Sequence, residues 1–268
     1  MLNLLATVAL LTPPSPALLS SAPTSTALQE VDVRAAFVAL HAKNDAAGCE
    51  KLFREHPGDV LETIDADLEG SLAVWEKNPE APDEQAIAEQ QVRALWGAKL
   101  ATKVSGDPIF TDYTSAFIGW TPEQRRQFRG GQAAFGRSRK ALKAGEHDNA
   151  AAAARECVEL AAPLGDWWGQ AMGLSALGQV LAAQQKHAEA VTPLSQAALI
   201  YRQLQRVGDE YNAIRTLAGA LRSSGALRRA HAALERAAEL AQRLGDERGK
   251  TAIEAQLAEL AKELGEVK

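Results

Sequence analysis

The sequence predicts an all-α protein, a right-handed solenoid of helical hairpins preceded by an α-helical N-terminal region. Ala and Leu dominate a composition with 46% hydrophobic and only 5% aromatic residues. Apolar residues recur at helical steps of three and four along most of the chain. From about residue 131, small and large apolar residues also return with a period of forty, and self-similarity at a fixed period is typical of stacked helical repeats.

The first 27 residues are expected to lie outside the fold. Their apolar run at residues 2–11 is broken by two prolines and is shorter than the roughly 20 residues that a membrane-spanning helix needs. Ser25 and Ala27 supply the small residues of a cleavage site, which favours a signal peptide and an exported protein, periplasmic or secreted. No Lys or Arg precedes the run, so the alternative is an apolar leader on a cytoplasmic protein.

Residues 31–130 are predicted to form the helical N-terminal region. Helical spacing predicts a hairpin over residues 31–57, and the Pro57-Gly58 pair ends it. A further helix is predicted over residues 59–77. Asp83 is expected to cap the helix that follows.

An aromatic stretch separates this region from the repeats. Six of the chain's 14 aromatic residues fall within 26 positions: Phe110, Tyr113, Phe117, Trp120, Phe128 and Phe135. The first four are spaced three, four and three apart, which places them on one helical face. We interpret the stretch as a seam that packs the N-terminal helices against the first repeat, with a ligand platform as the alternative.

The repeats are predicted over residues 131–268. Three polar turns divide the hairpins, at Gly145-Glu-His-Asp148, Gln184-Gln-Lys-His187 and Ser223-Ser-Gly-Ala226. The second helices are expected to end at Leu164-Gly-Asp166, Val207-Gly-Asp209 and Leu244-Gly-Asp246, where Gly would take the left-handed position and Asp would cap the next helix. The unequal glycine spacings imply that the second closing helix runs about three residues longer. The Glu- and Lys-rich helix after Asp246 is predicted to be a polar C-terminal cap.

The repeated positions carry a family resemblance. The small residues are Gly178, Ala190 and Ala197, then Ala218, Ala230 and Ala237; the large ones are Leu177, Leu181 and Leu194, then Leu217, Leu221 and Leu234. This pattern resembles the tetratricopeptide repeat family, in a forty-residue variant, over about residues 131–265. The first copy departs from it at Arg137, where a large apolar residue is expected, and the proline that often ends the family's unit occurs only as Pro163.

The resemblance implies a scaffold that binds another protein or peptide on the concave face lined by its first helices. Carried over by register, the solvent-facing positions are Gln132, Phe135, Arg139 and Lys143, then Gln179, then Asn212, Arg215 and Arg222. Guanidinium groups hold carboxylates in pairs of hydrogen bonds, so an acidic or C-terminal peptide is the expected ligand. The alternative is that these are ordinary solvated side chains. The residues do not reproduce the carboxylate clamp by which some members hold chaperone tails.

Charge argues against a nucleic-acid partner. The net charge is −5, and residues 30–120 carry 17 acidic and 8 basic side chains. Residues 121–268 carry 17 acidic and 21 basic side chains, an excess too small for a nucleic-acid-binding domain. No transmembrane segment is expected in the mature chain, and the pattern leaves the oligomeric state open.

Motifs that carry catalysis are not found. The chain has no HExxH, phosphate-binding glycine loop, Gly-x-Ser-x-Gly elbow or Cys/His cluster, so we expect no enzyme activity, cofactor or metal site. Asp65 and Asp67 point to different faces of one helix, and the other carboxylates are interpreted as solvated charges. Cys49 and Cys157 are expected to be buried thiols or, in an exported chain, a disulfide.

Two functional classes remain. The first is a protein-interaction scaffold that uses an open groove. The second is a regulatory sensor that binds a small ligand or peptide between the N-terminal helices and the repeats, and a closed cavity of about 300–1,000 Å³ there would favour it. An enzyme would instead need converging His, Asp or Glu side chains with perturbed pKa values in that cavity.

Overall fold

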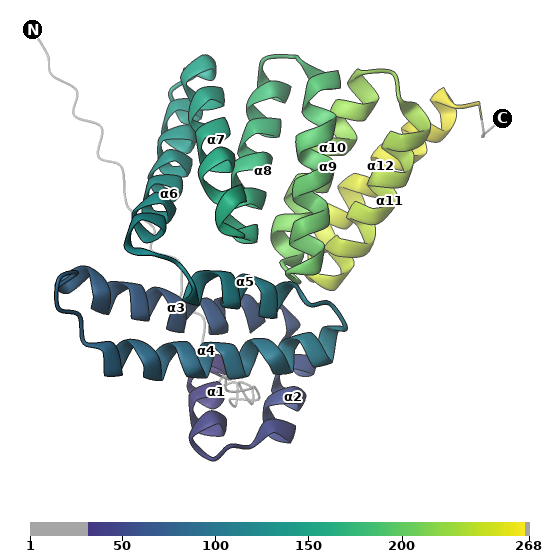
Figure 1. The fold of residues 1–268 in the computed structure, drawn as a ribbon. Helices are drawn as coiled ribbons and strands as arrows, with labels where there is room; N and C mark the ends of the chain where they lie inside the picture. Colours follow the sequence, from purple (N-terminus) through teal and green to yellow (C-terminus); the bar gives the residue numbers. More distant parts are fainter. Residues whose placement is uncertain (1–31, 266–268) are drawn as a thin grey trace, which may run out of the picture. The chain divides into compact units, whose positions relative to one another are not determined.

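The computed structural model describes residues 32–265, and within that range it contains twelve α-helices, two short 3₁₀ segments and no strand. The ribbon in Figure 1 runs from helix to helix through short loops. The predicted all-α fold, a solenoid of helical hairpins preceded by a helical N-terminal region, is confirmed. The predicted signal peptide or leader lies outside the described residues. No helix in the described range is long and apolar enough to cross a membrane.

Five helices precede the repeats. They are α1 (Val33–Ala42), α2 (Ala46–Glu55), α3 (Val60–Lys77), α4 (Glu84–Ser105) and α5 (Ile109–Ile118), with a 3₁₀ turn at Pro57–Asp59 between α2 and α3. Aspartates cap three of them, because the side chains of Asp32, Asp45 and Asp83 each accept the backbone N–H three residues on. The predicted cap at Asp83 is confirmed.

The expectation that the remaining carboxylates are solvated charges was wrong at Glu50 and Glu210, which are buried, and Asp67 is buried as well. Asp67 is fully buried and joins three helices, accepting hydrogen bonds from Arg34 on α1, 2.8 Å away, and from Arg93 on α4, 2.9 Å away. Glu210 is 1% exposed and accepts from Arg202 and Arg236 at 3.1 and 2.9 Å. Both are paired with arginine, as buried charges must be.

The aromatic stretch is a packing seam, as predicted. Phe117 on α5, Trp120 just after it and Phe128 on the next helix form one cluster, with ring centroids 4.3 to 5.5 Å apart. Trp120 Nε1 also donates to the carbonyl of Leu164, 2.9 Å away. The seam therefore joins α5 to both helices of the first hairpin.

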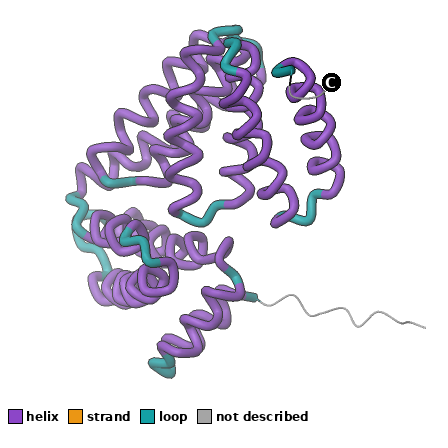
Figure 2. The backbone as a smooth tube through the Cα atoms, turned by 90° about the vertical axis from the view of Figure 1, so that its right-hand side faces the viewer, coloured by secondary structure: helices purple, strands orange, loops and turns teal. Residues whose placement is uncertain are grey.

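Seven helices form the solenoid. They are α6 (Pro122–Lys143), α7 (His147–Ala161), α8 (Trp167–Ala183), α9 (His187–Gln203), α10 (Val207–Ser223), α11 (Leu227–Arg243) and α12 (Glu247–Glu263), with a 3₁₀ turn at Ala162–Leu164 after α7. Figure 2 shows them alternating up and down, with the loops gathered at the two ends. From α8 on, every helix has 17 residues. Each starts twenty residues after the one before.

The loops between these helices share one conformation. Their central residues have left-handed backbone: Gly145, Gln185, Gln205, Gly225 and Gly245, with φ between 58° and 79°. The residue that follows donates its N–H back to a carbonyl in the last turn of the helix, as Arg206 does to Tyr201 at 2.8 Å. This is the bond pattern of a helix closed by a left-handed residue.

The structure corrects one predicted helix end. Helix α9 ends at Gln203, and Gly208 and Asp209 lie in the first turn of α10. The second closing helix is therefore no longer than its neighbours, and the spacing of forty holds at the loops themselves. The left-handed position is filled by Gln205, so the Gly-Asp pair downstream gave a false signal. The ends predicted at Gly165 and Gly245 are confirmed, with Asp166 and Asp246 as the following caps.

Small residues allow close approach where the helices cross. A Cβ at Gly178 on α8 would lie 2.4 Å from Leu194 Cγ on α9, and Leu194 is itself fully buried.

Both cysteines are free and buried, and burial raises the pKa of Cys49 to about 12 and that of Cys157 to about 11. The thiol alternative is thus confirmed over the disulfide.

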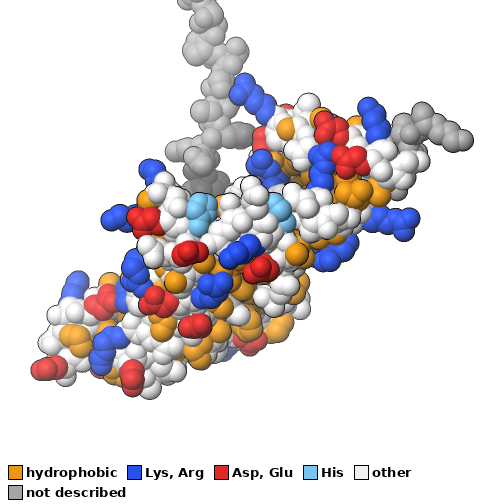
Figure 3. Space-filling model, turned by 90° about the horizontal axis from the view of Figure 1, so that it is seen from above, with side chains coloured by type: hydrophobic (Ala, Val, Ile, Leu, Met, Phe, Trp, Pro, Cys, Tyr) orange, Lys and Arg blue, Asp and Glu red, His pale blue; other side chains and the backbone are white. Residues whose placement is uncertain are grey.

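Seen from above, the solenoid presents the loops that close α6, α8 and α10. In Figure 3 this face carries basic and acidic side chains side by side, with histidine side chains among them. Neither sign gathers into a large patch on this face. Intermixed charges are typical of a solvated protein surface.

Candidate functional site

Two adjoining hollows lie on the first helices of the hairpins. The first, of about 320 Å³, is lined mainly by α6, α8 and α10, and the second, of about 420 Å³, by α8, α10 and α12 with Leu234 of α11. Gln179 and Asn212 line both hollows. We call this continuous surface the inner groove. It crosses the first helix of each hairpin in turn, from α6 through α8 and α10 to α12. An extended ligand could lie along such a surface.

Five of the eight predicted site residues line the inner groove. They are Phe135 and Arg139 on α6, Gln179 on α8, and Asn212 and Arg215 on α10. They meet because α6, α8 and α10 rise side by side with the same face turned inward. Their role in binding stays a prediction.

The other three predicted residues lie elsewhere. Lys143 is the last residue of α6, is exposed and lines neither hollow. Arg222 pairs with Glu259 and Glu263 of α12. Gln132 donates to Glu69 of α3 at 2.7 Å and accepts from Arg129, also at 2.7 Å.

The two arginines of the groove, Arg139 and Arg215, each lie over an aromatic ring and have no carboxylate partner in the described range. Arg139 lies over the ring of Phe135 and Arg215 over that of Tyr211, at 5.8 and 5.3 Å from the centroids. Within residues 32–265 neither forms an ion pair, whereas Arg206 pairs with both Glu62 and Asp209. Both arginines are exposed, so their N–H groups can reach a ligand in the groove.

Amide side chains lie between these charges. Gln179 Nε2 donates to Ser175 Oγ at 3.3 Å, a long bond. The side chain of Asn212 is exposed and makes no hydrogen bond to another residue of the range 32–265. Such amides can donate to and accept from a peptide backbone.

Sequence reasoning missed several polar residues of the groove, among them Ser138, Thr216 and Gln256. Two more, Tyr201 and Asp209, are assigned other roles by the sequence pattern. Tyr201 comes from the second helix α9, where the repeat pattern predicts packing, and burial raises its pKa. Asp209 was interpreted as a helix cap, yet it lies inside α10 and accepts from Arg206 Nε at 2.8 Å. No local signal distinguishes these roles.

A separate cavity of about 190 Å³ lies between the N-terminal helices and the repeats. We call it the junction cavity. Residues of α3, α5, α6, α7 and α8 line it: Asp65, Tyr113, Phe128, Gly131, Gln132, Cys157, Asp166, Trp168, Gly169 and Met172. Met172 also lines the inner groove, so the cavity adjoins one end of the groove.

Two carboxyl groups in this cavity have raised pKa values. Burial raises the pKa of Asp65 to about 7, although the hydroxyl of Tyr113 donates to it at 2.5 Å and opposes the shift. Burial also raises the pKa of Asp166 to about 6, against a 2.8 Å hydrogen bond from the Gly169 backbone N–H. The nearby charge of Glu69 pushes both in the same direction.

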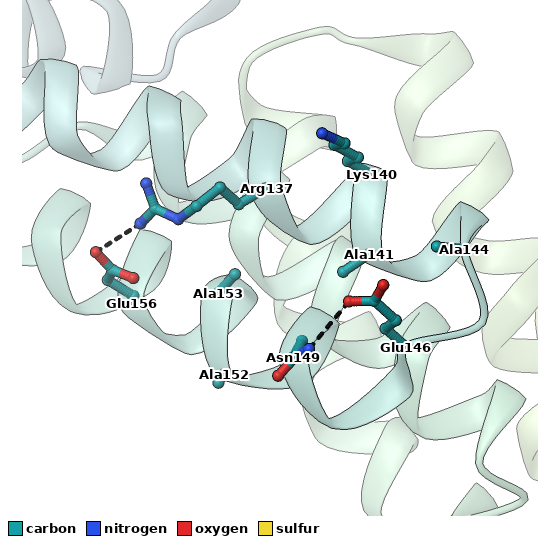
Figure 4. A pocket seen from close by; sticks show the side chains of 9 residues that line it. All are labelled: Arg137, Lys140, Ala141, Ala144, Glu146, Asn149, Ala152, Ala153 and Glu156. Carbon is teal, nitrogen blue, oxygen red and sulfur yellow. Dashed lines mark hydrogen bonds and ion pairs between the residues drawn. The ribbon is translucent and has the colours of Figure 1, made fainter.

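A third hollow, of about 500 Å³, lies between α6 and α7 on the open side of the first hairpin. Figure 4 shows its polar side chains pairing with one another: Arg137 with Glu156 at 2.8 Å, and Asn149 with Glu146 at 3.0 Å. Lys140 extends away from these pairs in Figure 4. The pairing leaves this hollow little polar capacity for a ligand. It also explains Arg137, which stands at an exposed edge where the repeat pattern expects an apolar residue.

No protein-family model matches the chain, and no curated protein matches its sequence. Within residues 32–265 no group of three or more His, Cys, Asp or Glu side chains is placed to hold a metal ion. Function must therefore be inferred from the inner groove and the junction cavity.

Proposed function

We propose that this protein is a non-enzymatic scaffold, similar to tetratricopeptide repeat proteins, that binds an extended segment of another protein in its inner groove. The observation that supports it best is that two arginines without ion-pair partners in the described range, Arg139 and Arg215, lie in the same groove as Gln179 and Asn212. Helical solenoids commonly bind along a surface of this kind.

The groove chemistry favours an acidic segment. Arg139 and Arg215 stand on the first and third helices of the groove, so carboxylates spaced along an extended peptide could meet both. The amides between them would bind the peptide backbone. Asp209 lies at the groove as an opposing charge, and Arg206, which it shares with Glu62, offsets part of it.

The test is binding of an array of peptides with Asp or Glu at varied spacings, followed by fluorescence polarisation on the best binder. We expect Arg215→Glu to weaken that binder at least tenfold, since it replaces an attraction with a repulsion. Arg228→Glu is the matched control, because Arg228 is exposed on α11 and lines neither hollow. Equal losses in both variants, or a preference for basic peptides, would contradict the proposal.

The junction cavity favours a second function, a regulatory sensor for a small ligand. Its place between the N-terminal helices and the repeats supports this candidate. Two converging carboxyl groups of raised pKa are also what an enzyme site would need, so the cavity favours a sensor by its position alone. At about 190 Å³ it is smaller than the usual cavity for a drug-sized ligand, so the ligand would be small. A groove ligand that binds equally well with the cavity filled or empty would argue against coupling between them.

We also propose that the chain is exported, on the evidence of the apolar run and of Ser25 and Ala27 in the sequence. N-terminal sequencing of the protein from its native cells tests this. A new N-terminus near residue 28 is expected. An intact Met1 would contradict export and place the scaffold in the cytoplasm.

A further inference from the structure

The junction cavity holds two carboxyl groups, and in each of them only one of the two oxygens accepts a hydrogen bond from the described residues. One oxygen of Asp65 accepts from Tyr113 and one oxygen of Asp166 accepts from Gly169. Within residues 32–265 the second oxygen of each accepts no hydrogen bond. Asp166 is 4% exposed, so its spare oxygen has little access to water except through the cavity that it lines. Neither spare oxygen is among the fully buried, unpartnered polar atoms of the described range, so both are open to a ligand that supplies donors from the cavity.

The charges around the cavity are negative on balance. No Lys, Arg or His lines it. Two arginines lie over aromatic rings of its wall, Arg129 over Phe128 and Arg206 over Trp168, at 5.7 and 5.2 Å from the centroids. Each is already paired with two carboxylates, Arg129 with Glu69 and Glu76 and Arg206 with Glu62 and Asp209. The remaining titratable lining groups are neutral at pH 7, because burial raises the pKa of the Tyr113 hydroxyl well above its usual value and that of Cys157 to about 11.

The rest of the wall is apolar and aromatic. Phe128, Trp168 and Met172 contribute it, beside the ring of Tyr113. The volume of about 190 Å³ corresponds to about six water molecules at liquid density. The cavity therefore combines an acidic end with a short apolar body.

We propose that the junction cavity binds a small primary alkylammonium ion. Its three N–H donors match the spare oxygens of Asp65 and Asp166, and its charge balances theirs. Its alkyl chain would lie against Phe128, Trp168 and Met172. Such a pair, with hydrogen bonds completed, is the arrangement in which a buried charge becomes tolerable.

Other small ligands fit less well. An anion would meet two carboxyl groups and no cation. A calcium ion takes six to eight oxygen ligands and a magnesium ion six, far more than two aspartates and the amide of Gln132 provide. A neutral alcohol would leave the carboxylate charges unbalanced.

The test is isothermal titration of the full chain with n-butylamine near pH 8, with butan-1-ol as the neutral isostere. We expect saturable binding of the amine and none of the alcohol. Asp65→Asn and Asp166→Asn should each weaken the amine at least tenfold. Both keep an acceptor for their present donors, and asparagine caps helices about as well as aspartate does. Asp112→Asn, on the exposed face of α5, is the matched control.

A second measurement uses the wild-type chain alone. The affinity for n-butylamine should fall at least tenfold between pH 8 and pH 5, because Asp65 and Asp166 take up protons in that interval while the amine stays charged. Glu69, Glu76 and Arg129 also face this region, where Arg129 pairs with both glutamates, and Arg206 lies over the ring of Trp168. Absence of saturable binding, equal binding of butan-1-ol, an affinity that does not change with pH, or an equal loss in Asp112→Asn would each overturn the proposal. None of these results bears on peptide binding in the inner groove.

Discussion

Gln205 takes the same left-handed backbone position as Gly165, forty residues earlier, with φ of 58° against 65°. A residue with a Cβ pays about 1–2 kcal/mol for this conformation, whereas glycine adopts it freely. The loop geometry is therefore set by the packing of the helices on either side, and this packing is strong enough to hold a glutamine where glycine would be preferred. The same holds at Gln185, where φ is 61°.

Gln205→Gly should stabilise the protein by about 1 kcal/mol, because it removes the backbone strain while leaving the loop unchanged. Urea unfolding followed by circular dichroism measures it. Gln196→Gly is the control, since Gln196 is exposed in the middle of α9 and glycine there should cost about 1 kcal/mol. A loss of stability in Gln205→Gly would mean that the left-handed position is not where the structure places it.

Two glycines within helices should respond in opposite ways to the same substitution. Gly178→Ala should destabilise the protein by about 1–3 kcal/mol, because its Cβ would meet Leu194 Cγ at 2.4 Å in a filled core. Gly219→Ala should stabilise it by about 0.5–1 kcal/mol, because nothing lies within 4 Å of that Cβ and alanine favours the helix. Thermal unfolding of both variants compares them directly. Stabilisation in both would show that α8 and α9 are not packed as described.

Arg222 should contribute to the C-terminal helix and leave the groove ligand unaffected. It pairs with Glu259 and Glu263, so Arg222→Ala should loosen α12 slightly, since exposed ion pairs contribute little to stability. Hydrogen exchange of the α12 amides measures this effect. Peptide affinity should change less than twofold, in contrast to Arg215→Ala. An equal loss of affinity in both variants would return Arg222 to the binding surface.

The pH dependence of stability should carry the signature of Asp65. Its folded pKa of about 7 lies above the ordinary aspartate value of about 3.9, so between these values the folded chain holds a proton that the unfolded chain has released. The stability this carboxyl contributes is present below about pH 4 and is lost as the pH rises through 7. The unfolding free energy of the wild type relative to Asp65→Asn should therefore fall by about 2–3 kcal/mol from pH 5 to pH 8.

Urea unfolding at these two pH values, with ligand absent, measures the difference. Asp112→Asn should show no such change relative to the wild type, because Asp112 is exposed. If the unfolding free energies of the wild type and of Asp65→Asn differed by the same amount at pH 5 and at pH 8, the raised pKa of Asp65 would be contradicted. The stability contributed by Asp166 should also fall as the pH rises, but at lower pH than for Asp65, since the pKa of Asp166 is about 6.

Periodicity predicted most of the fold because the solenoid is built from local contacts. The turns at Gly145 and Gly225 and the caps at Asp83, Asp166 and Asp246 follow from residues within one turn of a helix. The same local signals failed at Val207–Asp209. There the true loop contains Gln205, while a glycine and an aspartate follow inside α10. Only the spacing of forty between equivalent helices identifies the correct position.

The junction cavity could not be predicted in this way. Asp65 and Asp166 are a hundred residues apart, and each has an ordinary local interpretation, one as a helix-surface charge and the other as a helix cap. The cavity exists because the aromatic seam brings α3 and α5 against α6 and α8, and the depth of that contact depends on tertiary packing.

Because the later helices are evenly spaced, the solenoid can be lengthened by whole repeats. Because α8 to α12 have equal lengths and begin every twenty residues, a forty-residue block such as residues 187–226 can be duplicated without shifting any helix face. Each added block would extend the inner groove by the first helix of one more hairpin. A longer ligand could then contact the side chains of that helix. Ligand length could thus be changed by copying DNA in frame, with no new folding problem to solve.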